Sequence, residues 1–257
     1  MSLIEISIGD LALSLGFIAL VVVLSRLEGL AMERTLLTGT VRSMVQLIAV
    51  GYVLKVVFDL ERWYWVVLAV LVMTMVAAHT ARKRQTVRVP HCFWTMAGSI
   101  GLAAALVLGS LVGVILRVAP WYQPQYLIPL AGIILATTMN ATALSVDRFL
   151  SEIKQRRTLV EAALALGAGA KQASRASTAA AFRAGMMPFV NTMMVAGIVA
   201  LPGMMTGQIL GGVAPTDAVR YQIVIIYGIT AAAAVSSLAA LAIVRRQIFT
   251  RRAQLAL

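Results

Sequence analysis

The chain has 257 residues, of which 60% are hydrophobic and only 12% are charged. Ordinary soluble proteins contain about 45–50% apolar and about 25% charged residues, so this composition excludes a soluble globular domain and indicates a membrane protein. The 22 basic and 10 acidic side chains give a net charge of +12. The single cysteine, Cys92, excludes an internal disulfide.

Seven apolar stretches are long enough to cross a bilayer, because a helix needs about 20 residues to span about 30 Å of hydrocarbon. In chain order they are residues 8–25, 40–58, 63–81, 93–117, 127–146, 188–210 and 221–244. The chain is therefore predicted to be all-α, with residues 1–257 forming a single transmembrane domain. A secretory signal begins with positive residues, whereas Glu5 and Asp10 stand at the first stretch, so we expect it to be a retained helix.

Lysine and arginine predict the orientation, because short basic loops remain in the cytoplasm. Most of them fall in 26–42, 82–88, 147–187 and 245–252. This pattern places the N-terminus outside and the C-terminus in the cytoplasm. It also accounts for the net charge without nucleic acid as a partner, although a soluble chain this basic would suggest one.

The longest connection, residues 147–187, lies on the predicted cytoplasmic side and is rich in residues that favour helices. Gly167 and Gly169 predict a break, followed by a second helical run over 171–187. A helix, a glycine break and a helix would make an elbow that transmits movement from a soluble partner to the spans. The alternative is a basic amphipathic segment lying on membrane lipid headgroups.

Two patterns in this part of the chain resemble known permeases. Glu161-Ala162-Ala163 followed by Gly167 resembles the EAA loop of ABC-type permeases, although Ser177 to Ala180 replace the Ile-x-Leu-Pro of that pattern. The run from Gly197 to Ile209, followed by Gly212, Pro215 and Tyr221-Gln222-Ile223, resembles the FetB (YbbM) family of ABC permeases. Leu164 to Ala168 with Gln172-Ala173, and the run 42–58, are also similar to that family.

The FetB resemblance covers the whole chain and implies the membrane subunit of an ABC exporter in the bacterial inner (plasma) membrane. Bacterial members are implicated in iron export, metal homeostasis and resistance to oxidative stress, and they work with a separate cytoplasmic ATPase. Plant relatives are linked to aluminium tolerance and nucleotide-sugar export, so a nucleotide sugar or another small solute stays open as cargo. The resemblance places ATPase coupling on Glu161, Ala162, Ala163, Leu166, Gly167, Ala168 and Gln172.

The chain itself has no phosphate-binding G-x-x-x-x-G-K-[ST] motif, and Gly167 to Lys171 has the wrong spacing for one. We therefore expect no cofactor on this chain, with ATP and Mg²⁺ on the partner subunit. Paired carboxylates, a nucleophile elbow and an HExxH motif are also missing, which argues against an enzyme. Few helices would line a pathway in one copy, so we expect a homodimer; an ATP-independent carrier or a membrane anchor remain alternatives.

Polar residues inside spans are costly in lipid and tend to face partners or a pathway. Arg42 and Gln46 share one face of the second stretch, or Arg42 extends to the membrane surface. Asn140 and Asp147 in the fifth stretch line a pathway or form interhelical hydrogen bonds. Asn191 in the sixth is a further pathway candidate.

Paired methionines surround the sixth stretch. In a continuous helix Met186, Met193 and Met204 would form one line, with Met187, Met194 and Met205 beside it. Pro202 and Gly203 should interrupt the helix before the last pair, as in transporters that bind substrate at broken helices. Thioethers suit Cu(I) better than iron, and flexible packing is the alternative. The predicted pathway thus includes Met193, Met194, Pro202, Gly203, Met204 and Met205.

A metal-ligand hypothesis concerns His79, His91 and Cys92, which lie near the predicted cytoplasmic ends of the third and fourth stretches. They could meet there and receive an Fe(II)-type ion. The alternative is that they are surface or interfacial residues.

Overall fold

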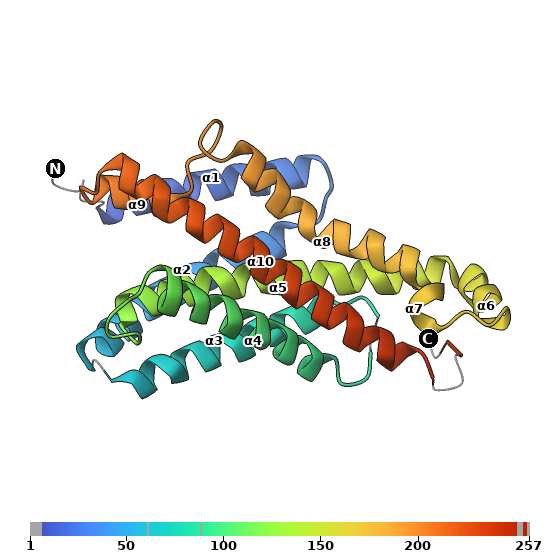
Figure 1. The fold of residues 1–257 in the computed structure, drawn as a ribbon. Coiled ribbons are helices and arrows are strands. Elements are labelled where there is room, and N and C mark those ends of the chain that lie inside the picture. The colour runs from blue at the N-terminus through green and yellow to red at the C-terminus, as the bar shows by residue number, and fades with distance from the viewer. Residues whose placement is uncertain (1–6, 61, 88, 251–253, 256–257) are drawn as a thin grey trace. The chain divides into compact units, whose positions relative to one another are not determined.

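The computed structural model describes residues 7–60, 62–87, 89–250 and 254–255 and is almost entirely helical (Figure 1). Six of its helices are long and apolar enough to cross a membrane. They are α1 Ile8–Leu27, α2 Glu33–Leu60, α3 Trp63–Lys83, α4 Cys92–Ser110 with the π-helical turn Leu111–Ile115, α5 Pro124–Gln155 and α10 Pro215–Ile248. The remaining helices are α6 Arg157–Ala165, α7 Ala170–Ala173, α8 Arg175–Val195 and α9 Gly203–Leu210. The predicted helical membrane architecture is therefore confirmed, whereas Glu5, Arg88, Arg251 and Arg252 lie outside the described residues.

The chain divides into two compact units, of which the first comprises residues 1–61 and 210–212. Its α1 begins at a capping box, in which the Ser7 hydroxyl accepts from the Asp10 N–H while the Asp10 carboxylate accepts from the Ser7 N–H. The turn to α2 is held by the Met32 N–H, which donates to the Ser25 hydroxyl at 3.2 Å. This unit supplies two of the six candidate spans.

The second unit comprises residues 62–209 and 213–257 and contains the main core. Its central helix is α5, which packs against α3, α4, α8 and α10. Pro124 starts α5 and Pro215 starts α10, positions where the missing N–H of proline has no helical partner to lose. The largest fully buried side chains of this core include Met96, Ile100, Leu130, Ile134, Phe149 and Leu241.

Helices α5 and α8 cross at unusually small residues. A methyl group added at Gly185 of α8 would collide with the Ser145 hydroxyl of α5 and come within 2.9 Å of the Ala141 carbonyl oxygen. Lipid tails are as apolar as the side chains they replace, so membrane helices gain affinity for one another mainly through close packing of small residues. Gly185 therefore allows the backbones of α5 and α8 to approach each other.

The segment that follows α3 is tied to α5 by three hydrogen bonds. The Arg84 guanidinium donates to the Asn140 side-chain oxygen, and Gln85 Nε2 donates to the Ala143 carbonyl at 3.1 Å. The Thr86 N–H donates to the Asp147 carboxylate at 2.9 Å. These bonds fix the connection between α3 and α4 against the same part of α5 that leads toward α6.

The predicted span over 188–210 is not one helix. Helix α8 ends at Val195, residues 196–202 form a turn, and α9 then begins at Gly203. Gly197 has a φ of +83° and its N–H donates to the Ala200 carbonyl at 3.0 Å, a conformation that favours glycine. The interruption expected at Pro202 is confirmed, but it starts earlier because Gly197 turns the chain first. The predicted count of seven continuous spans is not confirmed.

The close crossing of α5 and α8 can be tested with Gly185→Ala. We expect the detergent-solubilised protein to lose about 1–3 kcal/mol of stability, because an overpacked crossing forces the helices apart. Thermal denaturation midpoints would measure this loss. Gly98→Ala on α4 is the matched control, since its added methyl group meets no atom within 4 Å and alanine favours a helix. Equal midpoints for the two variants would show that the crossing is not tight.

Candidate functional site

The predicted elbow between α5 and α8 is present. Helix α5 ends at Gln155, α6 follows after Arg156, and the chain returns through α7 to α8. The predicted break at glycine is confirmed: Gly167 has a φ of +89°. Its N–H donates to the Leu164 carbonyl and the Ala168 N–H donates to the Ala163 carbonyl, both at 3.0 Å. This pair of bonds is a Schellman motif, which requires a left-handed residue at the position of Gly167.

The elbow presents apolar side chains to its surroundings. Leu166 is 89% exposed and Leu159 is 70% exposed, whereas Val160 on the opposite face of α6 is buried. Exposed apolar patches mark surfaces that bind another protein or a membrane. Within the described chain, one face of the elbow is therefore buried, and the other is exposed and free to bind a partner protein.

The predicted coupling residues occupy this outward face and its edges. Glu161 is partly exposed and forms an ion pair with Arg157 at 2.7 Å. Ala162, Gly167 and Gln172 are exposed, and Ala163 and Ala168 are half-buried. An open groove of about 690 Å³ adjoins them, lined by Gly169, Lys171, Gln172 and Arg175. The tip of the elbow thus combines exposed leucine with a positively charged groove.

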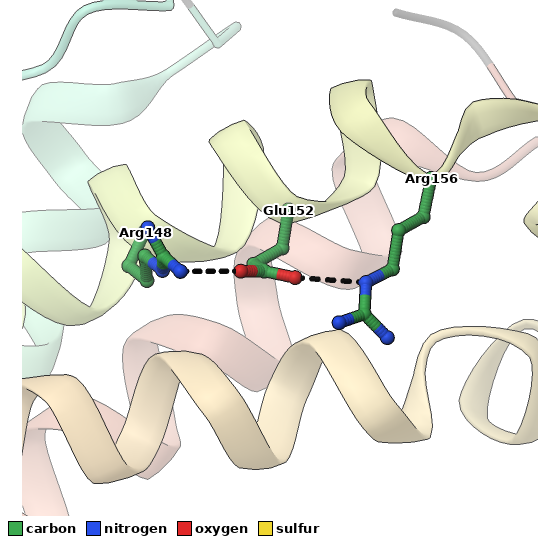
Figure 2. Close-up of polar contacts among 3 residues, drawn as sticks. All are labelled: Arg148, Glu152 and Arg156. Atoms are coloured by element: carbon green, nitrogen blue, oxygen red, sulfur yellow. Dashed lines mark ion pairs between the residues drawn. The ribbon is translucent and has the colours of Figure 1, made fainter.

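An ion-pair cluster around the buried Glu152, at the base of the elbow, was not predicted. Figure 2 shows Glu152 of α5 between Arg148 and Arg156, on the side of α5 that faces α8. The Arg148 Nη2 lies 2.7 Å from Glu152 Oε1, and the Arg156 Nε lies 3.0 Å from Glu152 Oε2. The spacing of four residues between each pair, typical of ion pairs along a helix, is the signal in the sequence that could have revealed it.

The break at Arg156 was also not predicted. Its φ of −102° and ψ of 22° end α5 and start α6. The residues around it favour helices, so no proline or glycine marks the position. The elbow consequently has a joint at Arg156 in addition to the glycine turn.

The polar pathway candidates on α5 have packing partners. The Asn140 side-chain oxygen accepts a hydrogen bond from Arg84, and the Asp147 carboxylate accepts one from the Thr86 N–H. These bonds agree with the alternative expectation that the two residues form hydrogen bonds between helices. Arg42 and Gln46 are exposed on α2 and belong to the first unit. Asn191 is exposed on α8.

The predicted line of methionines is interrupted, which corrects the expectation of one continuous ladder. Met193 and Met194 lie on α8, whereas Met204 and Met205 lie on α9, beyond the turn that includes Pro202 and precedes Gly203. Helical spacing cannot relate methionines on the two sides of residues 196–202, because this segment is not helical. The Thr230 hydroxyl of α10 donates to the Ile226 carbonyl at 2.8 Å and lies 3.5 Å from the Met193 sulfur, so this thioether is in contact with α10.

The predicted metal cluster is not formed. Among the residues that the structure describes, no group of three or more His, Cys, Asp and Glu side chains could hold a metal ion. His79 is exposed on α3, His91 is exposed in a left-handed conformation before α4, and Cys92 is buried at the start of α4. The three residues lie near the same ends of α3 and α4, but their side chains have different surroundings: His79 and His91 are exposed, whereas Cys92 is buried.

Comparison with known proteins places the chain in a family. A UPF0014 membrane protein (slr1647) of Synechocystis is 41% identical over 99% of this chain and 98% of its own length. The protein ALUMINUM SENSITIVE 3 of Arabidopsis thaliana is 34% identical over 95% of this chain and 88% of its own length. The probable iron export permease protein FetB of Escherichia coli is 32% identical over 96% and 93%. No solved structure shows significant similarity to the chain.

These relatives confirm the resemblance to FetB-like permeases. The model of the UPF0014 family, described as an uncharacterised protein family, matches residues 8–249. The chain therefore belongs to the UPF0014 family.

Proposed function

We propose that this chain is the membrane permease subunit of an exporter that moves iron using ATP hydrolysed by a separate cytoplasmic subunit. The observation that carries the proposal is the elbow formed by α6, Gly167 and α7, which exposes Leu166 beyond a bundle of long apolar helices. The E. coli relative, named a probable iron export permease protein, supports both the permease role and the cargo.

The elbow is suited to a soluble partner because backbone hydrogen bonds hold its apolar tip in place. The Schellman bonds at Gly167 fix the position of Leu166 in the absence of a partner. A preorganised tip loses little conformational entropy on docking, which favours binding. An ATP-dependent partner can move such a tip and, through it, the two helices α5 and α8 that the elbow joins.

The proposed orientation rests on the distribution of basic residues, and the proposed dimer rests on the number of helices in one copy. Basic residues at the end of α3, the end of α10 and the elbow would lie in the cytoplasm, which places the elbow beside a soluble ATPase in a bacterial plasma membrane. Two copies related by a twofold axis would provide more helices to enclose a pathway than one copy can. ATP and Mg²⁺ would bind to the partner subunit.

Iron export does not require a tight metal site in this chain. A transported ion must be bound strongly enough to enter and weakly enough to leave. The described residues hold no cluster of three acidic, histidine or cysteine ligands, which is compatible with weak, sequential contacts to cargo. The Arabidopsis relative is named for aluminium sensitivity, which also favours a metal or metal complex as cargo.

The docking surface can be tested with Leu166→Asp. We expect the variant to reach the membrane but to lose the ATPase during purification, because a charge replaces a large apolar contact. Hot-spot residues in interfaces contribute about 2 kcal/mol or more, so binding should weaken by about 30-fold. Leu166→Met is the matched control, since it keeps an apolar side chain of similar size. Equal recovery of ATPase with both variants would contradict docking at this surface.

Transport can be tested in liposomes that contain the chain together with its ATPase. We expect Mg-ATP to drive Fe(II) across the membrane, detected with an iron-sensitive dye on the receiving side, and we expect no movement without ATP. Liposomes that hold Leu166→Asp should show only leak. Movement of a nucleotide sugar such as UDP-glucose without movement of Fe(II) would refute iron as the cargo while retaining the permease role.

A further inference from the structure

The ion-pair cluster at the base of the elbow suggests how movement passes from the elbow to the membrane. Resting on the proposed function, we infer that Glu152 and Arg156 form a stiff joint that makes α5 and α6 move together. Arg156 is then a positioning residue for coupling: it acts through α5 and does not contact the ATPase or the cargo.

The backbone places the joint at a single residue. Arg156 is the last cap of α5 and the first cap of α6, with non-helical φ and ψ. Its N–H donates to the Glu152 carbonyl and its carbonyl accepts from the Val160 N–H, both at 3.0 Å. A change in the two dihedral angles of this residue would therefore change the angle between α5 and α6.

The side chain of Arg156 opposes a change in φ, because rotation about the N–Cα bond would move this side chain away from Glu152. It folds back along α5, and its Nε lies 3.0 Å from Glu152 Oε2, one helical turn before the joint (Figure 2). The Glu152 side chain is only 5% exposed. Screening by water is reduced at such a site, so the attraction between these charges is stronger than that of an exposed pair.

The contributions of the two arginines to the cluster can be tested separately. Each side chain is 49% exposed, and each lies four residues from Glu152. Arg148 lies within α5, whereas Arg156 is the joint itself. Removal of either arginine leaves Glu152 paired with the other, which avoids the large cost of an unpaired buried charge. Arg148→Gln is therefore a matched control for Arg156→Gln.

A spectroscopic experiment tests the joint without reference to transport. Nitroxide labels at Ala136→Cys on α5 and Ala165→Cys at the far end of α6, both exposed positions, would be placed in a Cys92→Ala background in lipid nanodiscs. Electron–electron double resonance then measures the distribution of label distances. We expect Arg156→Gln to broaden it, Arg148→Gln to leave it narrow, and Arg156→Lys, which keeps the charge, to restore most of the narrow distribution.

A second measurement tests the consequence for coupling. In liposomes with the ATPase, Arg156→Gln should retain the ATPase but move about fivefold less Fe(II) per ATP hydrolysed, a typical lower value for coupling between sites. Arg148→Gln should keep the ratio of the unmodified chain. A structural defect alone would reduce ATPase recovery and transport together rather than the ratio.

Three results would overturn the inference: a narrow distribution in Arg156→Gln, equal broadening in Arg148→Gln, or a broad distribution with an unchanged Fe(II)-to-ATP ratio. If the unmodified chain moves no Fe(II) with ATP, iron export is refuted. The label distances then decide by themselves whether the joint exists.

Discussion

The close contact between α5 and α8 is the constraint on which the second unit depends. Lipid supplies no hydrophobic driving force between helices, so their association rests on shape and on small residues that let backbones approach. Gly185 meets Ser145 and Ala141 at this crossing. Because α5 leads into the elbow and α8 leads out of it, the same crossing sets the two ends from which the elbow projects.

The polar contacts of the second unit extend this constraint toward the elbow. Asn140 and Asp147 attach the segment after α3 to α5, and Glu152 then binds Arg156 where α5 ends. Asn140, Asp147 and Glu152 follow one another along the second half of α5. Asn140 and Asp147 thus brace α5 against the segment after α3, which is a common use of polar groups in membrane helices.

Much of the fold could be predicted from the sequence because length and hydropathy are strong signals in membranes. The helix predicted over 63–81 is found as α3 Trp63–Lys83, and the turn predicted at Gly167 is found because its positive φ requires glycine. The break at Arg156 could not be predicted, because it depends on tertiary packing and the local sequence favours a helix. The segment 188–210 was predicted as one span because its apolar residues outweighed the turn signals of Gly197 and Pro202.

In the candidate site too, residues that are close in the sequence could be predicted to lie together, whereas contacts that depend on the fold could not. The predicted coupling residues lie together on the elbow because they are close in the sequence, and such a motif stays together whatever the fold. His79, His91 and Cys92 were grouped by depth alone, and depth does not determine the direction of a side chain. Glu152 was overlooked although its spacing from both arginines is regular, since only burial distinguishes it from the exposed pair of Arg157 and Glu161.

The methionines are best understood through the helix break. Across the turn at 196–202 a helical repeat has no meaning, so Met204 and Met205 cannot continue the lines that begin on α8. The Met193 sulfur lies 3.5 Å from the Thr230 hydroxyl, which places this thioether in the contact between α8 and α10. A soft thioether is also a poor ligand for iron, which prefers oxygen and nitrogen. The helix break therefore removes the geometric basis for one continuous ladder of metal ligands.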